Sequence, residues 1–353
     1  MSIKNWPGGV VRKTPVVPAG PYQNGAASGV WTLEQQAYWL KQGLWPVAGN
    51  AAPTAVFAGG TIQNGNTVNV MDYITIESTG NAVDFGDLVT NINSLAGCAS
   101  STRGLVGGGY DADSNKLNVI QYITIASAGN ATDFGDLTGA YAPAELAAAN
   151  SQTRGIFAGG NSSNAPSNNS NLIQYVTIAT TGNATSFGNL TLGRMYFAGC
   201  SSSVRGIFGG GYRNNDIWSN VIDYITIAST ANATDFGDLL ETIMLVAACS
   251  SATRGVFSGG MNTGYSSVNV IAYITIASTG NATDFGDLLT GTQSLAGASS
   301  STRGVFGGGF TTDPINVIQF VTIATTGNAT DFGDLTVARR DLAGCSNANG
   351  GVQ

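Results

Sequence analysis

Histidine is absent from the sequence, and charged residues of either sign are scarce. They make up 10% of the 353 residues, and the formal net charge is −7. Without histidine the chain lacks the commonest general base near neutral pH and the usual ligands of copper oxidases. With few Lys and Arg residues it has no basic stripe to neutralise phosphates, so we expect no nucleic-acid binding.

Long apolar runs are missing as well. The sequence contains no stretch of about twenty apolar residues, the length that a membrane-spanning helix needs. The N-terminus also lacks a basic start followed by an apolar segment, which is the pattern of a secretion signal. We therefore expect a protein that is made in a cytosol and does not insert into a membrane.

Repetition, in contrast, dominates the sequence. A unit of about fifty residues recurs from Val56 onward, a period that is typical of propellers and solenoids. Its clearest mark is the motif DFGDL, whose aromatic residue is Phe85, Phe134, Phe187, Phe236, Phe285 or Phe332. The chain therefore consists mainly of six units that share one fold.

Each unit divides into four expected strands, which we call A, B, C and D. A small-residue stretch such as 95–100 leads through an Arg-Gly turn to an apolar run that ends in two glycines, as at 305–309. After a loop come a β-branched run such as 269–278, a TGNAT turn and the DFGDL piece. Strand C is apolar on both parities, which predicts a sheet covered on both faces. The Gly-Asn pairs predict tight C–D hairpins.

The order of strands predicts how the ring closes. Strand B first appears at Val56 with no strand A before it, whereas the last unit is followed by a lone A-like piece at 342–347. We expect this C-terminal strand to complete the first blade. The sequence thus predicts an all-β fold, a six-bladed β-propeller over residues 51–353 without an open edge.

The unit resembles the kelch family of β-propellers. The kelch repeat has an apolar strand that ends in two glycines, then a tyrosine and then a second aromatic residue. In the second unit these residues are Gly108, Gly109, Tyr122 and Phe134, and the last unit has Phe320 in place of the tyrosine. The resemblance implies four-stranded blades. Phenylalanine stands where the family usually has tryptophan, and the two aromatics lie further apart than is usual.

The few cysteines share one place in the repeat. They occupy strand A in four units, as Cys98, Cys200, Cys249 and Cys345. Ala149 and Ala298 take the same place in the other two units, which indicates a small, buried position. Packed sheets lie about 10 Å apart, whereas a disulfide needs α-carbons about 4.4 to 6.8 Å apart, so we expect free thiols.

Residues 1–50 do not belong to the repeat. Residues 1–29 are rich in Pro and Gly and predict an extended arm. Thr32 and Gln35 have the spacing of a capping box, so we expect a short helix over about 32–43. Such a helix must pack on its own propeller or on another protein. In the second case the partner-anchoring residues are Trp31, Tyr38, Trp39 and Trp45.

The segment 28–46, SGVWTLEQQAYWLKQGLWP, is similar to N-terminal segments of structural proteins in tailed phages, particularly those that infect marine cyanobacteria. The similarity depends on Gly29, Val30 and Trp31, the two glutamines and the final Trp-Pro. It implies a virion protein, made in the bacterial host cytoplasm and exposed on the particle. Its arm would attach to other virion proteins, and the protein would be oligomeric on the particle.

The two faces of the expected ring differ. A–B and C–D turns share one face and are uniform, whereas the B–C loops, on the other face with the D–A connections, vary in length and composition. Loops on a rigid scaffold often carry recognition, and aromatic residues suit sugars and proteins. The candidate ligand-binding residues are Tyr110, Asp111, Asp113, Tyr212, Arg213, Trp218, Tyr265 and Phe310. Drift between the copies, without any ligand, is the alternative.

Several motifs need no chemistry to explain them. DFG resembles the magnesium loop of kinases, but it occurs in repeated form without the other kinase motifs. Turn chemistry explains the N-x-T sequons. Asp pairs such as Asp284 with Asp287 suggest calcium, but the third unit has Ser186 and Asn189 instead, which favours capping or pairing with the turn arginines. We expect no metal and no cofactor.

An enzymatic alternative is a glycosidase with two carboxylates, drawn from Asp113, Asp216 and Asp313 in the varied loops. The sequence marks no pair among them, so we expect no enzymatic activity. Two hypotheses remain. One is an adhesin of a tail fibre or tail tip that binds a host surface glycan or protein. The other is a structural virion component, such as a head decoration or a tail-knob spacer, without a receptor role.

Overall fold

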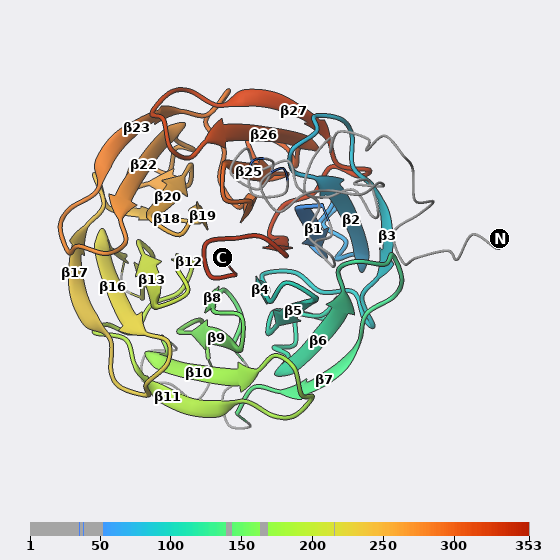
Figure 1. The fold of residues 1–353 in the computed structure, drawn as a ribbon, viewed down its shortest axis with the longest axis horizontal. Coiled ribbons are helices and arrows are strands. Elements are labelled where there is room, and N and C mark those ends of the chain that lie inside the picture. The colour runs from blue at the N-terminus through green and yellow to red at the C-terminus, as the bar shows by residue number, and fades with distance from the viewer. Residues whose placement is uncertain are drawn as a thin grey trace. The chain divides into compact units, whose positions relative to one another are not determined.

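The computed structural model describes residues 35, 38, 52–138, 143–162, 169–214 and 216–352. The chain from Pro53 onward forms one compact unit, in which six four-stranded antiparallel sheets surround a central axis (Figure 1). This arrangement confirms the predicted all-β, six-bladed propeller. Of the predicted helix over 32–43, only Gln35 and Tyr38 are described, and both are helical.

Strand A of each blade lies nearest the axis (Figure 1). From blade 1 to blade 6 these strands are β28 (Ala343–Ser346), β4 (Ala96–Ala99), β8 (Ala147–Asn150), β12 (Ala198–Ser201), β19 (Ala247–Ser250) and β24 (Ala296–Ser299). Their small residues let them converge around the axis. A Cβ atom on Gly199, for example, would collide with the carbonyl oxygen of Ala148 in the preceding blade.

The other strands follow outward in the order B, C and D. The B strands are β1 (Thr54–Ala58), β5 (Arg103–Gly107), β9 (Arg154–Ala158), β13 (Arg205–Gly209), β20 (Arg254–Ser258) and β25 (Arg303–Gly307). The C strands are β2 (Val70–Thr75), β6 (Val119–Thr124), β10 (Leu172–Thr177), β16 (Val221–Thr226), β22 (Val270–Thr275) and β26 (Val317–Thr322). The D strands are β3 (Val83–Asp87), β7 (Thr132–Asp136), β11 (Thr185–Asn189), β17 (Thr234–Asp238), β23 (Thr283–Asp287) and β27 (Thr330–Asp334).

Blade 1 joins the two ends of the propeller. Its strand order is β28-β1-β2-β3, so the last strand of the chain pairs with the first. In this antiparallel pair Ala55 lies opposite Ser346, and Ala58 lies opposite Ala343. The closure predicted from the lone A-like piece at 342–347 is therefore confirmed.

The core lies between blades. Met71 of β2 packs in a cluster with Val106 and Ile123 of blade 2, whereas Ile74 of the same strand packs in a cluster with Val305 of blade 6. Both faces of strand C are thus covered, as its sequence pattern predicts. The repeated aromatic pair of each blade forms an edge-to-face contact, such as Tyr73 with Phe85 at 5.9 Å between ring centroids.

The four cysteines are buried and free, in agreement with the prediction. Each sits against the backbone of the neighbouring blade, and a Cβ atom on Gly104 would come within 2.8 Å of Cys345 Sγ. Burial raises the pKa of the Cys200 thiol to about 12. These thiols are therefore inert packing groups and not nucleophiles.

The expectation of tight C–D hairpins is wrong. Tyr73 of β2 pairs with Val83 of β3, so the connection is much longer than a two-residue turn. It reaches instead to strand D of the preceding blade. In blade 2, Gly129 N donates to Phe85 O (2.7 Å), and Asn130 Oδ1 accepts a hydrogen bond from Asp87 N (3.0 Å). The asparagines of the sequons thus hold neighbouring blades together.

The turn arginines do not pair with the Asp residues of DFGDL in the described structure. The Arg103 guanidinium stacks on the Tyr122 ring at 4.8 Å and donates to the carbonyl oxygens of Ile178 (3.1 Å) and Ala179 (2.9 Å) in blade 3. A planar guanidinium fits between an aromatic face and a carbonyl edge, and this geometry recurs around the ring. Of the two expected roles of these Asp residues, capping or pairing with the turn arginines, the pairing is wrong, because the arginines form inter-blade hydrogen bonds instead.

Candidate functional site

The B–C loops and the D–A connections meet on one face of the propeller, which we call the varied face. Each D–A connection pairs with the B–C loop of the blade that it enters, as Asn93 does with Tyr110 and Met195 with Tyr212. In blade 5 this pairing forms a short ribbon of β18 (Ile243–Met244) and β21 (Met261–Asn262). The varied loops are therefore anchored by backbone hydrogen bonds.

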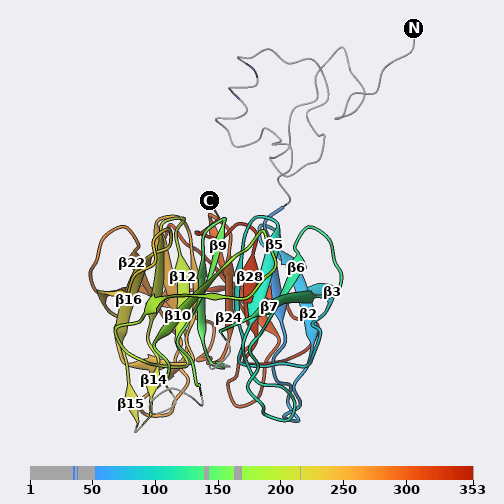
Figure 2. The same cartoon turned by 90° about the horizontal axis from the view of Figure 1, so that it is seen from below.

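Three of the predicted ligand-binding aromatics lie together on this face. Tyr212 and Trp218 face each other across a ribbon of β14 (Tyr212–Arg213) and β15 (Ile217–Trp218), with ring centroids 6.0 Å apart and an interplanar angle of 87°. Tyr265, from the B–C loop of blade 5, lies 5.7 Å from Trp218 at 84°. We call Tyr212, Trp218 and Tyr265 the aromatic cluster. Figure 2 shows the β14–β15 ribbon extending from the varied face.

Backbone conformation and a side-chain hydrogen bond position the residues of the aromatic cluster. Asp216 and Tyr265 both have left-handed backbones, each with φ 57°, which is uncommon for residues other than glycine. Tyr212 donates its hydroxyl hydrogen to Asp216 Oδ1 (3.1 Å). Desolvation and this hydrogen bond raise the pKa of Tyr212, so its hydroxyl is protonated at neutral pH. Tyr265 is 66% exposed at the loop tip.

Polar and apolar groups flank the aromatic cluster. Arg213 lies opposite Ile217 in the ribbon, and the Ile217 side chain is 47% exposed. Arg213, Asp216 and Ile217 therefore lie in the same loop as Tyr212 and Trp218 of the aromatic cluster. Together with Tyr265 they come from the B–C loops of blades 4 and 5.

The other predicted residues are not part of this cluster. Asp111 accepts hydrogen bonds at Oδ1 from the backbone N–H groups of Asp113 (2.9 Å) and Asn115 (2.8 Å), so it shapes its own loop. The hydrogen bonds from Asn115 lower the pKa of Asp111. Asp113 is exposed in blade 2. In blade 6, Arg340 stacks on the Phe310 ring at 5.1 Å and covers one of its faces.

Tyr110 contacts residues of blade 3 and of the connection that leads into it. Its hydroxyl accepts a hydrogen bond from Asn161 Nδ2 (3.0 Å). Burial, together with the nearby Glu145 carboxylate, raises the pKa of Tyr110 well above its usual value. The three carboxylates of the glycosidase alternative, Asp113, Asp216 and Asp313, belong to blades 2, 4 and 6, so no two of them lie in adjacent blades.

A ring of backbone hydrogen bonds around the channel mouth was not predicted from the sequence. One residue of each D–A connection has a left-handed backbone, with φ between 54° and 60°: Ser94, Glu145, Tyr196, Leu245, Ser294 and Asp341. Each donates its N–H to the carbonyl oxygen of the preceding member, as Ser94 does to Asp341 (2.8 Å) and Glu145 to Ser94 (2.9 Å). We call these residues the connector ring. The signal in the sequence is a position just before strand A that holds five different residue types in the six copies.

The connector ring surrounds a small cavity at the mouth of the channel. Its volume is about 80 Å³, and six apolar side chains lie beside the ring residues: Leu95, Leu146, Phe197, Val246, Leu295 and Leu342. Glu145 accepts a hydrogen bond from the Tyr196 hydroxyl (2.6 Å). Burial raises the pKa values of Glu145 and Asp341. Sites for drug-sized ligands have volumes of about 300 to 1,000 Å³, so this cavity is too small for a sugar.

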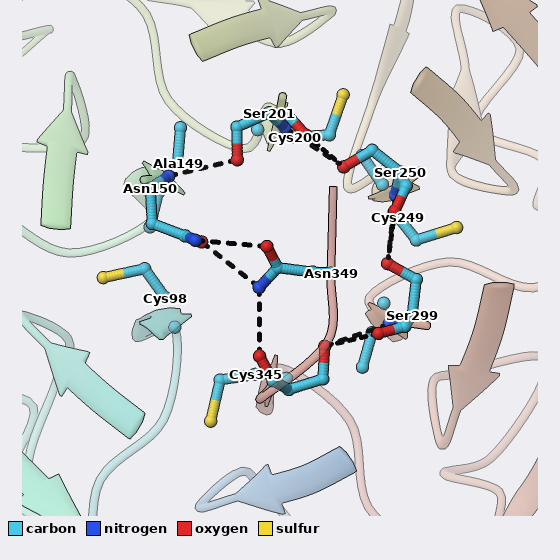
Figure 3. A pocket seen from close by; sticks show the side chains of 18 residues that line it. Cys98, Ala149, Asn150, Cys200, Ser201, Cys249, Ser250, Ser299, Cys345 and Asn349 are labelled. Carbon is cyan, nitrogen blue, oxygen red and sulfur yellow. Dashed lines mark hydrogen bonds between the residues drawn. The ribbon is translucent and has the colours of Figure 1, made fainter. Parts of the chain in front are cut away.

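The C-terminal tail, residues 347–352, narrows the other end of the channel (Figure 3). Asn349 and Asn150 exchange two amide hydrogen bonds, of 3.1 and 3.3 Å. Gly350 N donates to Ser250 O (2.9 Å), within a ring of serines contributed by successive A strands. A cavity of about 40 Å³ remains there.

Of the predicted partner-anchoring residues, Tyr38 is 57% exposed. Trp31, Trp39 and Trp45 lie outside the described residues. Within the described part of the chain, no group of three or more His, Cys, Asp or Glu side chains could hold a metal ion. No helix in that part is long and apolar enough to span a membrane.

Comparison with known proteins gives no family for this chain. No protein-family model matches the sequence, and no curated protein matches it significantly. The kelch resemblance therefore depends on the repeat pattern alone, whereas the propeller fold is a property of the structure itself.

Proposed function

We propose that the protein is a non-enzymatic binding module, an adhesin that recognises a glycan on a host surface through the aromatic cluster. The observation that carries the proposal is the edge-to-face arrangement of Trp218 between Tyr212 and Tyr265 on the varied face. Aromatic faces pack against the C–H faces of pyranose rings, while the tyrosine hydroxyls and the indole N–H can bind sugar hydroxyls.

The scaffold supports this proposal because it orders the rings before any ligand arrives. Tyr212 and Trp218 are paired across a ribbon, and the Tyr212 hydroxyl is held by Asp216. Rigid aromatic side chains lose little conformational entropy on binding. The cluster is open on the surface, which suits one stretch of a polymer. Weak binding at each site would be strengthened by several copies acting together.

The similarity of segment 28–46 to phage structural proteins supports a virion as the setting. In this proposal the arm attaches the protein to other virion proteins of a tail fibre or tail tip. The chain enters the propeller at Thr54, which pairs with Thr75 at the end of β2, on the face of the A–B and C–D turns. The aromatic cluster lies on the opposite face, so attachment through the arm leaves the cluster accessible.

Binding of the purified full-length protein to host cells and to their extracted surface polysaccharide tests the proposal. Trp218→Ala and Tyr265→Ala each remove one ring, and Val204→Ala, at an exposed position in an A–B turn, is the matched control. Loss of a central aromatic contact costs about 2 kcal/mol or more, so we expect binding to weaken about thirtyfold in Trp218→Ala. The Val204→Ala variant should bind as the wild type does.

Two results would contradict the adhesin. Equal binding by Trp218→Ala, Tyr265→Ala and wild type would remove the aromatic cluster from recognition. Binding by none of the proteins to cells or polysaccharide would favour the structural virion component. Matching thermal unfolding curves of the variants show that any loss is local.

A further inference from the structure

We propose that the cavity inside the connector ring binds a primary ammonium group, a site separate from the aromatic cluster and independent of the proposed function. The cavity opens on the varied face and is bounded by Glu145, Asp341 and Ser94 among the residues that line it. Asp341, Ser94 and Glu145 are consecutive members of the ring, joined by the hydrogen bonds Ser94 N to Asp341 O and Glu145 N to Ser94 O. Three residues that carry side-chain oxygen acceptors are therefore neighbours along the ring.

Glu145 carries the strongest indication of a ligand. It is one of the residues that line the cavity, and it is only 9% exposed. One carboxylate oxygen, Oε1, accepts the hydrogen bond from Tyr196, but the other, Oε2, is buried and has no hydrogen-bond partner among the described residues. A buried carboxylate oxygen without a donor is costly, and a donor entering the cavity would remove that cost.

The Glu145 carboxylate has no positively charged partner among the described residues around the cavity. Asp341 forms an ion pair with Arg340 (3.6 Å). Arg194 and Arg339 are buried against Asp223 and Asp72, so they do not serve the cavity. Among the described residues, Glu145 forms no ion pair, and its titratable neighbours Tyr110, Tyr196 and Asp341 bring no positive charge. A monovalent cation is therefore the matching ligand.

The lining selects an ammonium group over a metal ion. Calcium takes six to eight oxygen ligands, about twice what the three acceptors on this side of the ring supply. An ammonium group has three donors, which matches the acceptors of Glu145, Ser94 and Asp341. Its alkyl stem could rest on the apolar residues of the cavity, such as Leu245 and Val246, as lysine stems do elsewhere. The lysine side chain of a partner protein and a free alkylamine share this chemistry.

Calorimetric titration of the full-length protein with n-butylamine at pH 7.5 tests the site. n-Butanol serves as the neutral probe of similar shape, calcium chloride as the metal probe and a short acetylated peptide with one lysine as the protein-like probe. Glu145→Gln removes the charge, and Glu241→Gln, in the D–A connection that leads into blade 5, is the matched control. We expect saturable binding of n-butylamine that weakens at least tenfold in Glu145→Gln and is unchanged in Glu241→Gln.

The outcomes decide both the site and its source. Binding of n-butylamine and of the peptide supports a partner lysine, whereas binding of n-butylamine alone supports a free amine. The proposal is overturned if n-butylamine does not bind, if n-butanol binds equally, if calcium binds more tightly, or if Glu145→Gln binds as the wild type does. If Glu145→Gln does not fold, Ser94→Ala replaces it, with an expected severalfold loss and with unchanged affinity as the contrary result.

Discussion

At the scale of single residues, one buried position in strand C shows how the copies diverge without losing the fold. It is filled by Asp72, Gln121, Gln174, Asp223, Ala272 and Gln319. Where it is Asp, the preceding D–A connection supplies a buried arginine, as in Asp223 with Arg194 (2.9 Å) and Asp72 with Arg339 (2.8 Å). Where it is Gln, the side chain accepts a backbone N–H of the preceding blade, as Gln121 does from Val89 (2.7 Å).

Blade 2 has Ile92 and Gln121 at the repeat positions of Arg194 and Asp223. The Arg194–Asp223 pair can therefore be replaced by an Ile–Gln pair. Burial lowers the pKa of Arg194 to about 10, which leaves it charged at neutral pH. Removing one partner of a buried pair costs about 3–5 kcal/mol because the other charge is left without compensation. We expect Arg194→Ile to lose about that much free energy of unfolding. Adding Asp223→Gln should restore most of the loss, and a denaturant titration that shows additive losses would contradict this account.

Ala272 is smaller than the residue at the same position in the other blades, and it leaves a gap. Apolar residues of blades 4 and 5, including Leu240 and Val270, line a cavity of about 20 Å³ beside it. Leu240 occupies the place of Val89, whose N–H is bound by a glutamine in blade 2. Ala272→Gln should therefore stabilise the protein by about 1 kcal/mol through one added hydrogen bond and better packing. Chemical unfolding measures the gain, and Ala272→Leu, which fills the gap without an acceptor, should give less.

Glu145 makes stability depend on pH. Burial raises its pKa in the folded state above that of the unfolded chain, despite the hydrogen bond from Tyr196. The protonated form thus favours folding, so this contribution is present at low pH and is lost as the pH rises through the folded pKa. Each tenfold difference in proton affinity corresponds to about 1.4 kcal/mol.

Glu145→Gln mimics the protonated carboxyl and should separate this effect from the other acids, which include Asp341 and Asp223. We expect its melting temperature to match that of the wild type near pH 4 and to exceed it at pH 8. A variant that is less stable than the wild type at pH 8 would show that the Tyr196 hydrogen bond outweighs the cost of burial.

At the scale of elements, local pattern predicted the strands but not the contacts between blades. Apolar β-branched runs and paired glycines mark the strands because these properties depend on a few neighbours in the sequence. The partner of Asn130 is Asp87 in the preceding blade, and the partners of Arg103 are carbonyl groups in the following blade. The repeat pattern thus indicates that Asn130 and Arg103 have a structural role, whereas only the packed ring shows which groups they bind.

The C-terminal tail is an element whose role can be tested by a small change. Added Cβ atoms on Gly350 would collide with the carbonyl oxygens of Ser251 and Ser201. Gly350→Ala should push the tail out of the channel and break its hydrogen bonds with Asn150 and Ser250. With about 1 kcal/mol for each lost bond, we expect the free energy of unfolding to fall by about 2–3 kcal/mol.

Carboxypeptidase digestion provides an independent measurement of the tail. The wild type should resist removal of residues before Val352, whose carbonyl oxygen accepts a hydrogen bond from Gln152 (2.6 Å). The Gly350→Ala variant should lose its last residues quickly while the propeller remains folded. Equal resistance of both proteins would show that the tail tolerates the added methyl group in place.

At the scale of the whole molecule, repetition made the architecture predictable. It gave much less information about the aromatic cluster. A strand boundary that is ambiguous in one copy is clear in another. The first unit has no strand A of its own, which predicts that segment 342–347 supplies it. The aromatic cluster was only partly predictable, because Trp218 and Tyr265 come from different repeats and meet only when blades 4 and 5 pack. Tyr110 and Phe310 are also aromatic residues of varied loops, so the sequence does not distinguish them from the cluster. In the structure Tyr110 accepts a hydrogen bond from Asn161, and Arg340 stacks on Phe310.

Closure by β28 should make the six blades one cooperative unit. Without this strand β1 would present an open edge, since β2 is its only other partner among the described strands. A chain that ends at residue 341 also loses Leu342 and Ala343 from the cores that flank blade 1. We expect such a chain to aggregate, because an unpaired strand edge is a template for other chains. Its blade 1 amides should exchange hydrogen far faster than those of blade 4.

A chain that ends at residue 347 is the control, because it keeps β28 and lacks only most of the tail. In this control and in the full-length protein, blades 1 and 4 should exchange together, at the rate of global unfolding. If the chain that ends at 341 stays monomeric and protects blade 1 as well as blade 4, closure is not what unites the ring. The packing between neighbouring blades would then be sufficient to hold an open circle.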